Sequence, residues 1–261
     1  MRANSKRSGR CRGTAAASLH GTPRGILGIV VLAPWEHQCV HFLLVHGTTQ
    51  SPDGWRLLID ELHAIGHSAV TTDLARFGEG ASAIDYAEAV AAEHPGSGVD
   101  VVVGHSGAGL LLPAIASATE AKMQVYLAAF VPDGSRSLMD ELNDDATAIC
   151  NAEWIGVDPT ADHDAARHFL FHDCSPELAD WAVTTLRAFV PIAVYSEQVL
   201  LAPAVPAMCV VPDSDRTSRT EWMIAASRER LGIEPTIVPG GHSPHVSRPR
   251  DVARILAPGS E

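Results

Sequence analysis

The sequence predicts an α/β fold with a mostly parallel central sheet and helices on both of its faces. Short apolar segments alternate with segments of helical periodicity along most of the chain. Strands and helices that alternate over short connections are typical of parallel sheets with helices on both faces. At 261 residues the chain is long enough for one such domain with a substantial core.

The periodicity predicts elements in two groups, separated by a long interruption. Before the interruption we expect strands at 40–45, 68–72, 99–103 and 124–131, and helices at about 53–65, 83–93 and 110–121. After it we expect strands at 207–211 and 236–238, and helices at 219–231 and about 249–256. The interruption therefore lies before the last two strands of the sheet.

The interruption itself, from Ser135 to about Ala204, is acidic and helical in pattern. Some 70 residues are too many for a plain loop, so we expect a helical cap over the site that controls which substrate fits. Three histidines at positions 163, 168 and 172 lie in it, but His163 falls off the helix face that the other two share. We interpret them as a solvated face and expect neither a metal nor a cofactor.

Charge is distributed unevenly along the chain. The net charge is −12, yet the first 24 residues carry six Arg or Lys and no acid, which leaves 13 basic against 31 acidic residues in the rest. An acidic body argues against nucleic-acid binding and favours neutral small molecules as partners. We expect residues 1–38 to be a basic, disordered extension, with a targeting peptide as the alternative, and residues 39–261 to form the folded domain.

Cysteine usage and hydropathy bear on location. The five cysteines are odd in number, widely spaced and without a CxxC pair, which favours reduced thiols and a cytoplasmic protein. No apolar run approaches the roughly 20 residues that a membrane-spanning helix needs, so we expect no membrane segment.

The segment Gly104-His-Ser-Gly-Ala-Gly109 joins a buried strand to a helix. A serine in such a sharp turn has a strained backbone, and its hydroxyl is exposed at the carboxyl edge of the sheet. Small residues around it let the strand and the helix pass closely. Ala108 stands where the G-x-S-x-G pattern has its second glycine, which is a conservative change. The turn makes Ser106 a candidate nucleophile.

A serine hydroxyl is a poor nucleophile near neutral pH, so a base must take its proton, and an acceptor must orient that base. His242 lies in a glycine-rich loop after the last expected strand. Asp215 lies in the loop after the first strand that follows the cap, with Asp213 and Asp133 as alternative acids. The order Ser, Asp, His is the one used by folds with this type of turn.

A tetrahedral intermediate also needs donors for its oxyanion. The backbone N–H of Gly107, directly after the nucleophile, is one candidate. The second is expected from the loop after the first strand, where Thr48 follows His46-Gly47.

These motifs together resemble the α/β-hydrolase superfamily, and most closely its small branch of plant methylesterases, hydroxynitrile lyases and related bacterial esterases. The resemblance covers roughly residues 40–257 and rests on His46-Gly47, the segment 104–109, Asp213-Ser-Asp-Arg216, Gly240-Gly-His-Ser-Pro244 and, in the cap, Phe169-Leu-Phe-His-Asp-Cys174. By position, the second Asp of the Asp-x-Asp pair matches the acid of the family, which supports Asp215.

The branch that the sequence resembles contains both esterases and lyases. Its hydroxynitrile lyases typically carry Thr after the residue matching His46 and Lys after the triad histidine, whereas this chain has Gly47 and Ser243. Both differences favour hydrolysis. We therefore expect a carboxylesterase-like serine hydrolase that acts on a small, largely neutral ester through an acyl-enzyme. The alternatives are a hydroxynitrile-lyase-like or other C–C bond-cleaving enzyme, and a non-catalytic small-molecule receptor.

Overall fold

The computed structural model describes residues 38–96 and 98–257. Within these residues six strands form one sheet in the order β2-β1-β3-β4-β5-β6, and every neighbouring pair is parallel. The strands are β1 (His41–Val45), β2 (Ser68–Thr72), β3 (Val101–His105), β4 (Met123–Leu127), β5 (Ala207–Pro212) and β6 (Thr236–Val238). The predicted fold class is confirmed.

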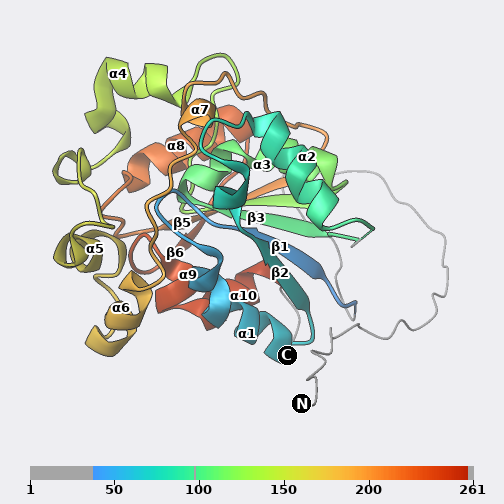
Figure 1. The fold of residues 1–261 in the computed structure, drawn as a ribbon, viewed down its shortest axis with the longest axis horizontal. Helices are drawn as coiled ribbons and strands as arrows, with labels where there is room; N and C mark the ends of the chain where they lie inside the picture. The colour runs from blue at the N-terminus through green and yellow to red at the C-terminus, as the bar shows by residue number, and fades with distance from the viewer. Residues whose placement is uncertain (1–37, 97, 258–261) are drawn as a thin grey trace.

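Helices cover both faces of this sheet (Figure 1). They are α1 (Arg56–Ala64), α2 (Ala83–Glu93), α3 (Leu112–Ala118), α8 (Thr220–Leu231), α9 (Pro244–Ser247) and α10 (Pro249–Leu256). Successive side chains of a strand point to opposite faces. In β3, Val102 accordingly joins the core formed with α2, α3 and α8, whereas Val101 and Val103 join the core formed with α1 and α10. The apolar run of a central strand thus supports two separate cores.

Between β4 and β5 the chain makes no strand, and residues 135–204, here called the helical insertion, contain four α-helices and one 3-10 helix (Ala152–Trp154). The α-helices are α4 (Leu138–Ile149), α5 (His163–Leu170), α6 (Pro176–Val183) and α7 (Ile192–Tyr195). The first three begin at polar N-cap residues whose side chains accept backbone N–H groups: Ser137, Asp162 and Ser175. In Figure 1, α4, α5 and α6 lie on the left, beyond one end of the strands.

The helical insertion is hydrogen-bonded to the loop that follows β1. Thr49 N–H donates to the carbonyl of Phe189 (2.8 Å), and Arg187 N–H donates to the carbonyl of Thr49 (3.0 Å). The hydroxyl of Ser51 donates to the carbonyl of Thr185 (2.6 Å). These bonds fix residues 185–189 of the insertion alongside the carboxyl end of β1.

The structure bears in part on the expectations about the N-terminal extension, the cysteines and the absence of a membrane segment. Residues 1–37, and with them nearly all of the predicted N-terminal extension, lie outside the described residues. Cys150, Cys174 and Cys209 are free thiols, as the cysteine usage predicts. Across the described part of the chain, no helix combines the length and apolar character needed to cross a membrane.

Gly109 is required by close packing rather than by its backbone angles. A Cβ at this position would lie 2.0 Å from the carbonyl oxygen of Phe130 and 3.0 Å from Cβ of Ala129. Gly109→Ala should therefore lower the free energy of unfolding by about 1–3 kcal/mol, measured by urea denaturation. Gly80→Ala is the matched control, because no atom lies within 4 Å of its Cβ position. Equal stability of the two variants would contradict this packing argument.

Candidate active site

Ser106 begins a 3-10 helix (Ser106–Leu110) directly after β3, and its φ is +55°. This left-handed conformation is strained for a residue with a side chain. It brings the serine against Gly47, where a Cβ would lie 2.9 Å from Cβ of Ser106 and 2.8 Å from the carbonyl oxygen of His105. The strained turn expected from the sequence is confirmed, and Gly47 leaves the space that the turn needs.

His242 is hydrogen-bonded to Asp215, and both side chains are buried. Nδ1–H of the imidazole donates to Oδ2 of Asp215 over 2.7 Å. The other carboxylate oxygen accepts the backbone N–H groups of Thr217 (2.7 Å) and Ser218 (3.1 Å). The carboxylate orientation is thereby fixed, and a proton on Nδ1 leaves Nε2 as the acceptor nitrogen of a neutral imidazole.

The hydroxyl of Thr217 contacts both members of this pair. Its oxygen lies 2.9 Å from Oδ1 of Asp215 and 2.8 Å from Nδ1 of His242. Because the carboxylate only accepts, the hydroxyl donates to Asp215, and its oxygen shares the Nδ1–H of His242. Thr217 was not among the site residues predicted from the sequence, although its place two residues after the candidate acid was an available signal.

Buried histidines support the backbone around His242. Nε2 of His105 lies 2.8 Å from the carbonyl oxygen of His242. Burial lowers the pKa of His105 well below its ordinary value, and it lowers the pKa of His46 to about 4 and that of His245 to about 3. Nδ1 of His105 lies 2.9 Å from Oε1 of Gln50. Both ring nitrogens of His105 therefore face acceptor oxygens, and the proton of the neutral imidazole donates to one of them.

The two alternative acids are engaged elsewhere. Asp213 accepts the hydroxyl of Ser214 (2.8 Å) and the N–H of Gly240 (3.0 Å). Asp133 accepts the N–H of Ser135 over 3.0 Å. Of the three candidate acids, the structure brings only Asp215 into hydrogen-bond contact with His242 within the residues it describes.

Ser106 and His242 line the same cavity, which has a volume of about 380 Å³. No hydrogen bond joins the two side chains within residues 38–96 and 98–257. Hydrogen bonds between a catalytic base and its nucleophile often tighten only when substrate binds. The rest of the lining is mainly apolar and aromatic, with Leu142, Trp154 and Leu170 contributed by the helical insertion.

The candidate oxyanion donors lie beside Ser106. Gly107 is in the first turn of the 3-10 helix, where N–H groups have no intrahelical partner. The N–H of Thr48 has no hydrogen-bond partner among the described residues, and Thr48 lines the cavity. The hydroxyl of Thr48 lies 2.7 Å from the hydroxyl of Tyr195, at the end of α7. Two backbone donors are therefore available next to the candidate nucleophile.

His172 and Asp173 of the insertion hold it against the loops of the candidate site. Nε2–H of His172 donates to the carbonyl of Ser214 (3.0 Å), and Asp173 accepts the N–H of Gly241 (3.0 Å). Side chains at both glycines before His242 would collide with this segment, since a Cβ at Gly240 would lie 2.2 Å from Oδ2 of Asp173. In the described part of the chain, no group of three or more potential ligands is arranged to hold a metal ion.

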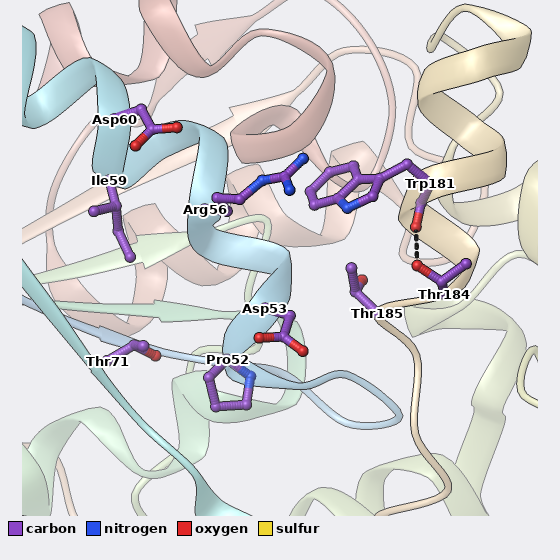
Figure 2. Close-up of a pocket in the computed structure, with 9 residues that line it drawn as sticks. All are labelled: Pro52, Asp53, Arg56, Ile59, Asp60, Thr71, Trp181, Thr184 and Thr185. Atoms are coloured by element: carbon purple, nitrogen blue, oxygen red, sulfur yellow. Dashed lines mark hydrogen bonds between the residues drawn. The ribbon is translucent and has the colours of Figure 1, made fainter. Parts of the chain in front are cut away.

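A second cavity, of about 420 Å³, lies between α1 and α6 (Figure 2). Figure 2 shows the guanidinium of Arg56 over the indole of Trp181, at 4.5 Å from the ring centroid. None of its lining residues is a serine, cysteine or histidine. The cation–π contact holds the insertion against α1.

Comparison with known proteins places the chain in a family. The sequence model of the alpha/beta hydrolase family matches residues 42–255. The chain belongs to the alpha/beta hydrolase family. No curated protein matches the sequence.

Solved structures similar to this alpha/beta hydrolase come from the branch that its sequence resembles. Polyneuridine aldehyde esterase is 22% identical with a TM-score of 0.70, and the match covers 86% of this chain and 100% of that one. A methylesterase from Arabidopsis is 17% identical with a TM-score of 0.61 and coverages of 83% and 97%. A thermophilic esterase from Thermogutta terrifontis is 20% identical with a TM-score of 0.60 and coverages of 85% and 89%. At these identities the similarity establishes the fold rather than the reaction.

We predict that the Thr217 hydroxyl, which contacts both Asp215 and His242, helps to position the His242 imidazole. Thr217→Val tests this prediction, because valine keeps the shape of the side chain and removes the hydroxyl. Loss of one hydrogen bond to the His242–Asp215 pair should slow labelling of Ser106 by a fluorophosphonate about tenfold, and Thr217→Ser should restore it. Thr220→Val is the matched control, because its hydroxyl bonds the carbonyl of Pro212 instead. If the two valine variants react at the same rate, the Thr217 hydroxyl has no positioning role.

Proposed function

We propose that this alpha/beta hydrolase is a serine hydrolase that cleaves a carboxylic ester of a small, largely neutral molecule. One observation supports the proposal most strongly. Ser106, held in a strained turn at the carboxyl end of β3, lines an apolar cavity together with His242, and His242 is hydrogen-bonded to buried Asp215. A nucleophile, a base and an acid that orients the base are the parts that acyl transfer needs.

In this proposal Ser106 Oγ attacks the ester carbonyl while Nε2 of His242 takes the hydroxyl proton. Asp215 stabilises the imidazolium, and the N–H groups of Thr48 and Gly107 donate to the oxyanion. The intermediate collapses, His242 returns the proton to the departing alkoxide, and the alcohol leaves. Water, deprotonated by His242, then attacks the acyl-enzyme and releases the carboxylic acid with Ser106 restored.

The cavity lining supports a neutral substrate with an apolar part. No Asp, Glu, Lys or Arg lines it, so it offers no ion-pair partner to a charged substrate. Phe130 from the sheet domain and Leu142, Trp154, Ile155 and Leu170 from the helical insertion supply apolar surface. We infer that the insertion acts as a cap that sets the shape of the acyl or alcohol subsite.

The lack of room for a side chain at position 47 supports ester hydrolysis over cyanohydrin cleavage. The threonine that hydroxynitrile lyases typically carry there would place its Cβ within 3 Å of both His105 and Ser106, unless the backbone moved. The position after His242, where those lyases have lysine, is held by fully buried Ser243, which is not in the cavity lining. The intact His–Asp pair favours an enzyme over a non-catalytic receptor.

The cytoplasmic location stays a prediction.

The proposed function is tested by an ester panel of varied acyl chains, with a cyanohydrin assayed alongside. The wild type should hydrolyse neutral esters, and Ser106→Ala should lose at least about 10⁴-fold in kcat with an unchanged circular dichroism spectrum. Ser117→Ala, whose hydroxyl bonds the carbonyl of Pro113 within α3, is the matched control and should retain activity. Undiminished hydrolysis by Ser106→Ala would end the proposal, and cleavage of the cyanohydrin alone would favour the lyase.

A further inference from the structure

The hydroxyls of Thr48 and Tyr195 meet directly beside the candidate oxyanion site. They are 147 positions apart in the sequence, yet their oxygens lie 2.7 Å apart. A Cβ on Gly107 would lie 2.3 Å from the hydroxyl oxygen of Thr48 and 2.5 Å from that of Tyr195. Both side chains line the cavity that contains Ser106. Two hydroxyl groups therefore lie against Gly107, whose N–H is a proposed oxyanion donor.

The spacing between these hydroxyls and the Gly107 nitrogen suits a shared acceptor. A Cβ lies within about 2.5 Å of the nitrogen of its own residue, so both oxygens are within roughly 5 Å of Gly107 N. When two donor atoms each lie about 2.9 Å from the same acceptor oxygen, the two donor atoms are about 4.5–5 Å apart. One oxyanion can thus accept from Gly107 N–H and from a hydroxyl of the pair.

One O–H of the Thr48–Tyr195 pair is not used by the hydrogen bond between the two side chains. The two hydroxyls carry two protons, and their mutual hydrogen bond uses one of them. Neither oxygen has a further partner among the residues that the structure describes. Burial raises the pKa of Tyr195 to about 12, so its hydroxyl keeps its proton near neutral pH. The pair therefore retains one O–H that can donate into the cavity.

We propose that Tyr195 is a catalytic residue of this site, a third oxyanion donor that the helical insertion supplies. The inference rests on the proposed function. Thr48 O–H donates to the phenolic oxygen of Tyr195, and the Tyr195 O–H donates to the oxyanion, because a phenol is a stronger donor than an aliphatic alcohol. The Thr48 bond polarises the phenol and strengthens its donation.

Backbone hydrogen bonds of residues 189–193, just before Tyr195 in the chain, fix the position of Tyr195. Val190 N–H donates to Oε1 of Glu79 (3.1 Å), and Ala193 N–H donates to the carbonyl of the same residue (3.3 Å). Phe189 is held by Thr49, the neighbour of Thr48. A donor that is held in place before the reaction stabilises the transition state without the cost of reorganisation.

The test is Tyr195→Phe, which removes the hydroxyl and keeps the ring. On a neutral ester the variant should lose about 10- to 100-fold in kcat, with KM changed by less than about threefold, because the bond strengthens as the oxyanion forms. Tyr86→Phe is the matched control, since its hydroxyl bonds the carbonyl of Gly78 away from the cavity and its loss should leave kcat unchanged. A rise in KM with unchanged kcat would mean that Tyr195 only shapes the pocket, which would overturn the inference.

Phosphonylation of Ser106 separates this inference from the proposed function, because the phosphonyl oxygen occupies the oxyanion position. Wild type labelled by a fluorophosphonate at least about tenfold faster than Tyr195→Phe would support the donor role. Equal labelling rates would overturn the donor role and leave the serine hydrolase intact. A wild type that is neither labelled nor active on esters would overturn the proposed function and the donor role with it.

Discussion

The left-handed backbone of Ser106 at the end of β3 is the constraint on which the candidate site depends. This conformation is tolerated because the neighbouring segments have glycine at the positions where they pack closest to the turn. A Cβ at Gly104 would lie 2.7 Å from Cγ of Leu112, and Cβ atoms at Gly47 and Gly109 would meet backbone carbonyls within 3 Å. The carbonyl of Ser106 is satisfied by the N–H of Phe130 (3.1 Å). Close packing therefore holds a strained serine at the edge of the sheet.

The topology of the sheet explains how distant segments converge on this serine. Ser106 follows β3, Asp215 follows β5 and His242 follows β6, and all three strands end at the same edge because the sheet is parallel. Ligands of open α/β sheets bind at this edge. The helical insertion leaves after β4 and returns before β5, so it lies over the loops that carry these residues. Its contacts with the loop after β1 place Tyr195 beside Thr48.

The local sequence pattern predicted the positions of helices and strands better than the side-chain contacts between them. Helix α2 (Ala83–Glu93) matches its expected range, because Ser82 caps it and its apolar residues recur at helical spacing. The helix expected at 110–121 begins only at Leu112, since a 3-10 turn precedes it, and Pro113 lies in its first turn, where proline is tolerated. Tyr195 could not be found in this way, because its role arises from a pairing across 147 positions that no local pattern encodes. Thr217 contacts His242 across 25 positions, and its place two residues after Asp215 was the one local signal.

The central claim is that Ser106 attacks the substrate carbonyl in the cavity it shares with His242, and that His242, oriented by Asp215, takes the hydroxyl proton. The crystal structure of the protein after reaction with a nitrophenyl phosphonate tests it most directly. The account predicts phosphorus bonded to Oγ of Ser106, Nε2 of His242 within about 3.2 Å of that oxygen, and the phosphonyl oxygen accepting from Thr48 and Gly107 N–H groups. Phosphorus on another residue, or on Ser106 with the phosphonyl oxygen turned away from those donors and the imidazole out of reach, would contradict it.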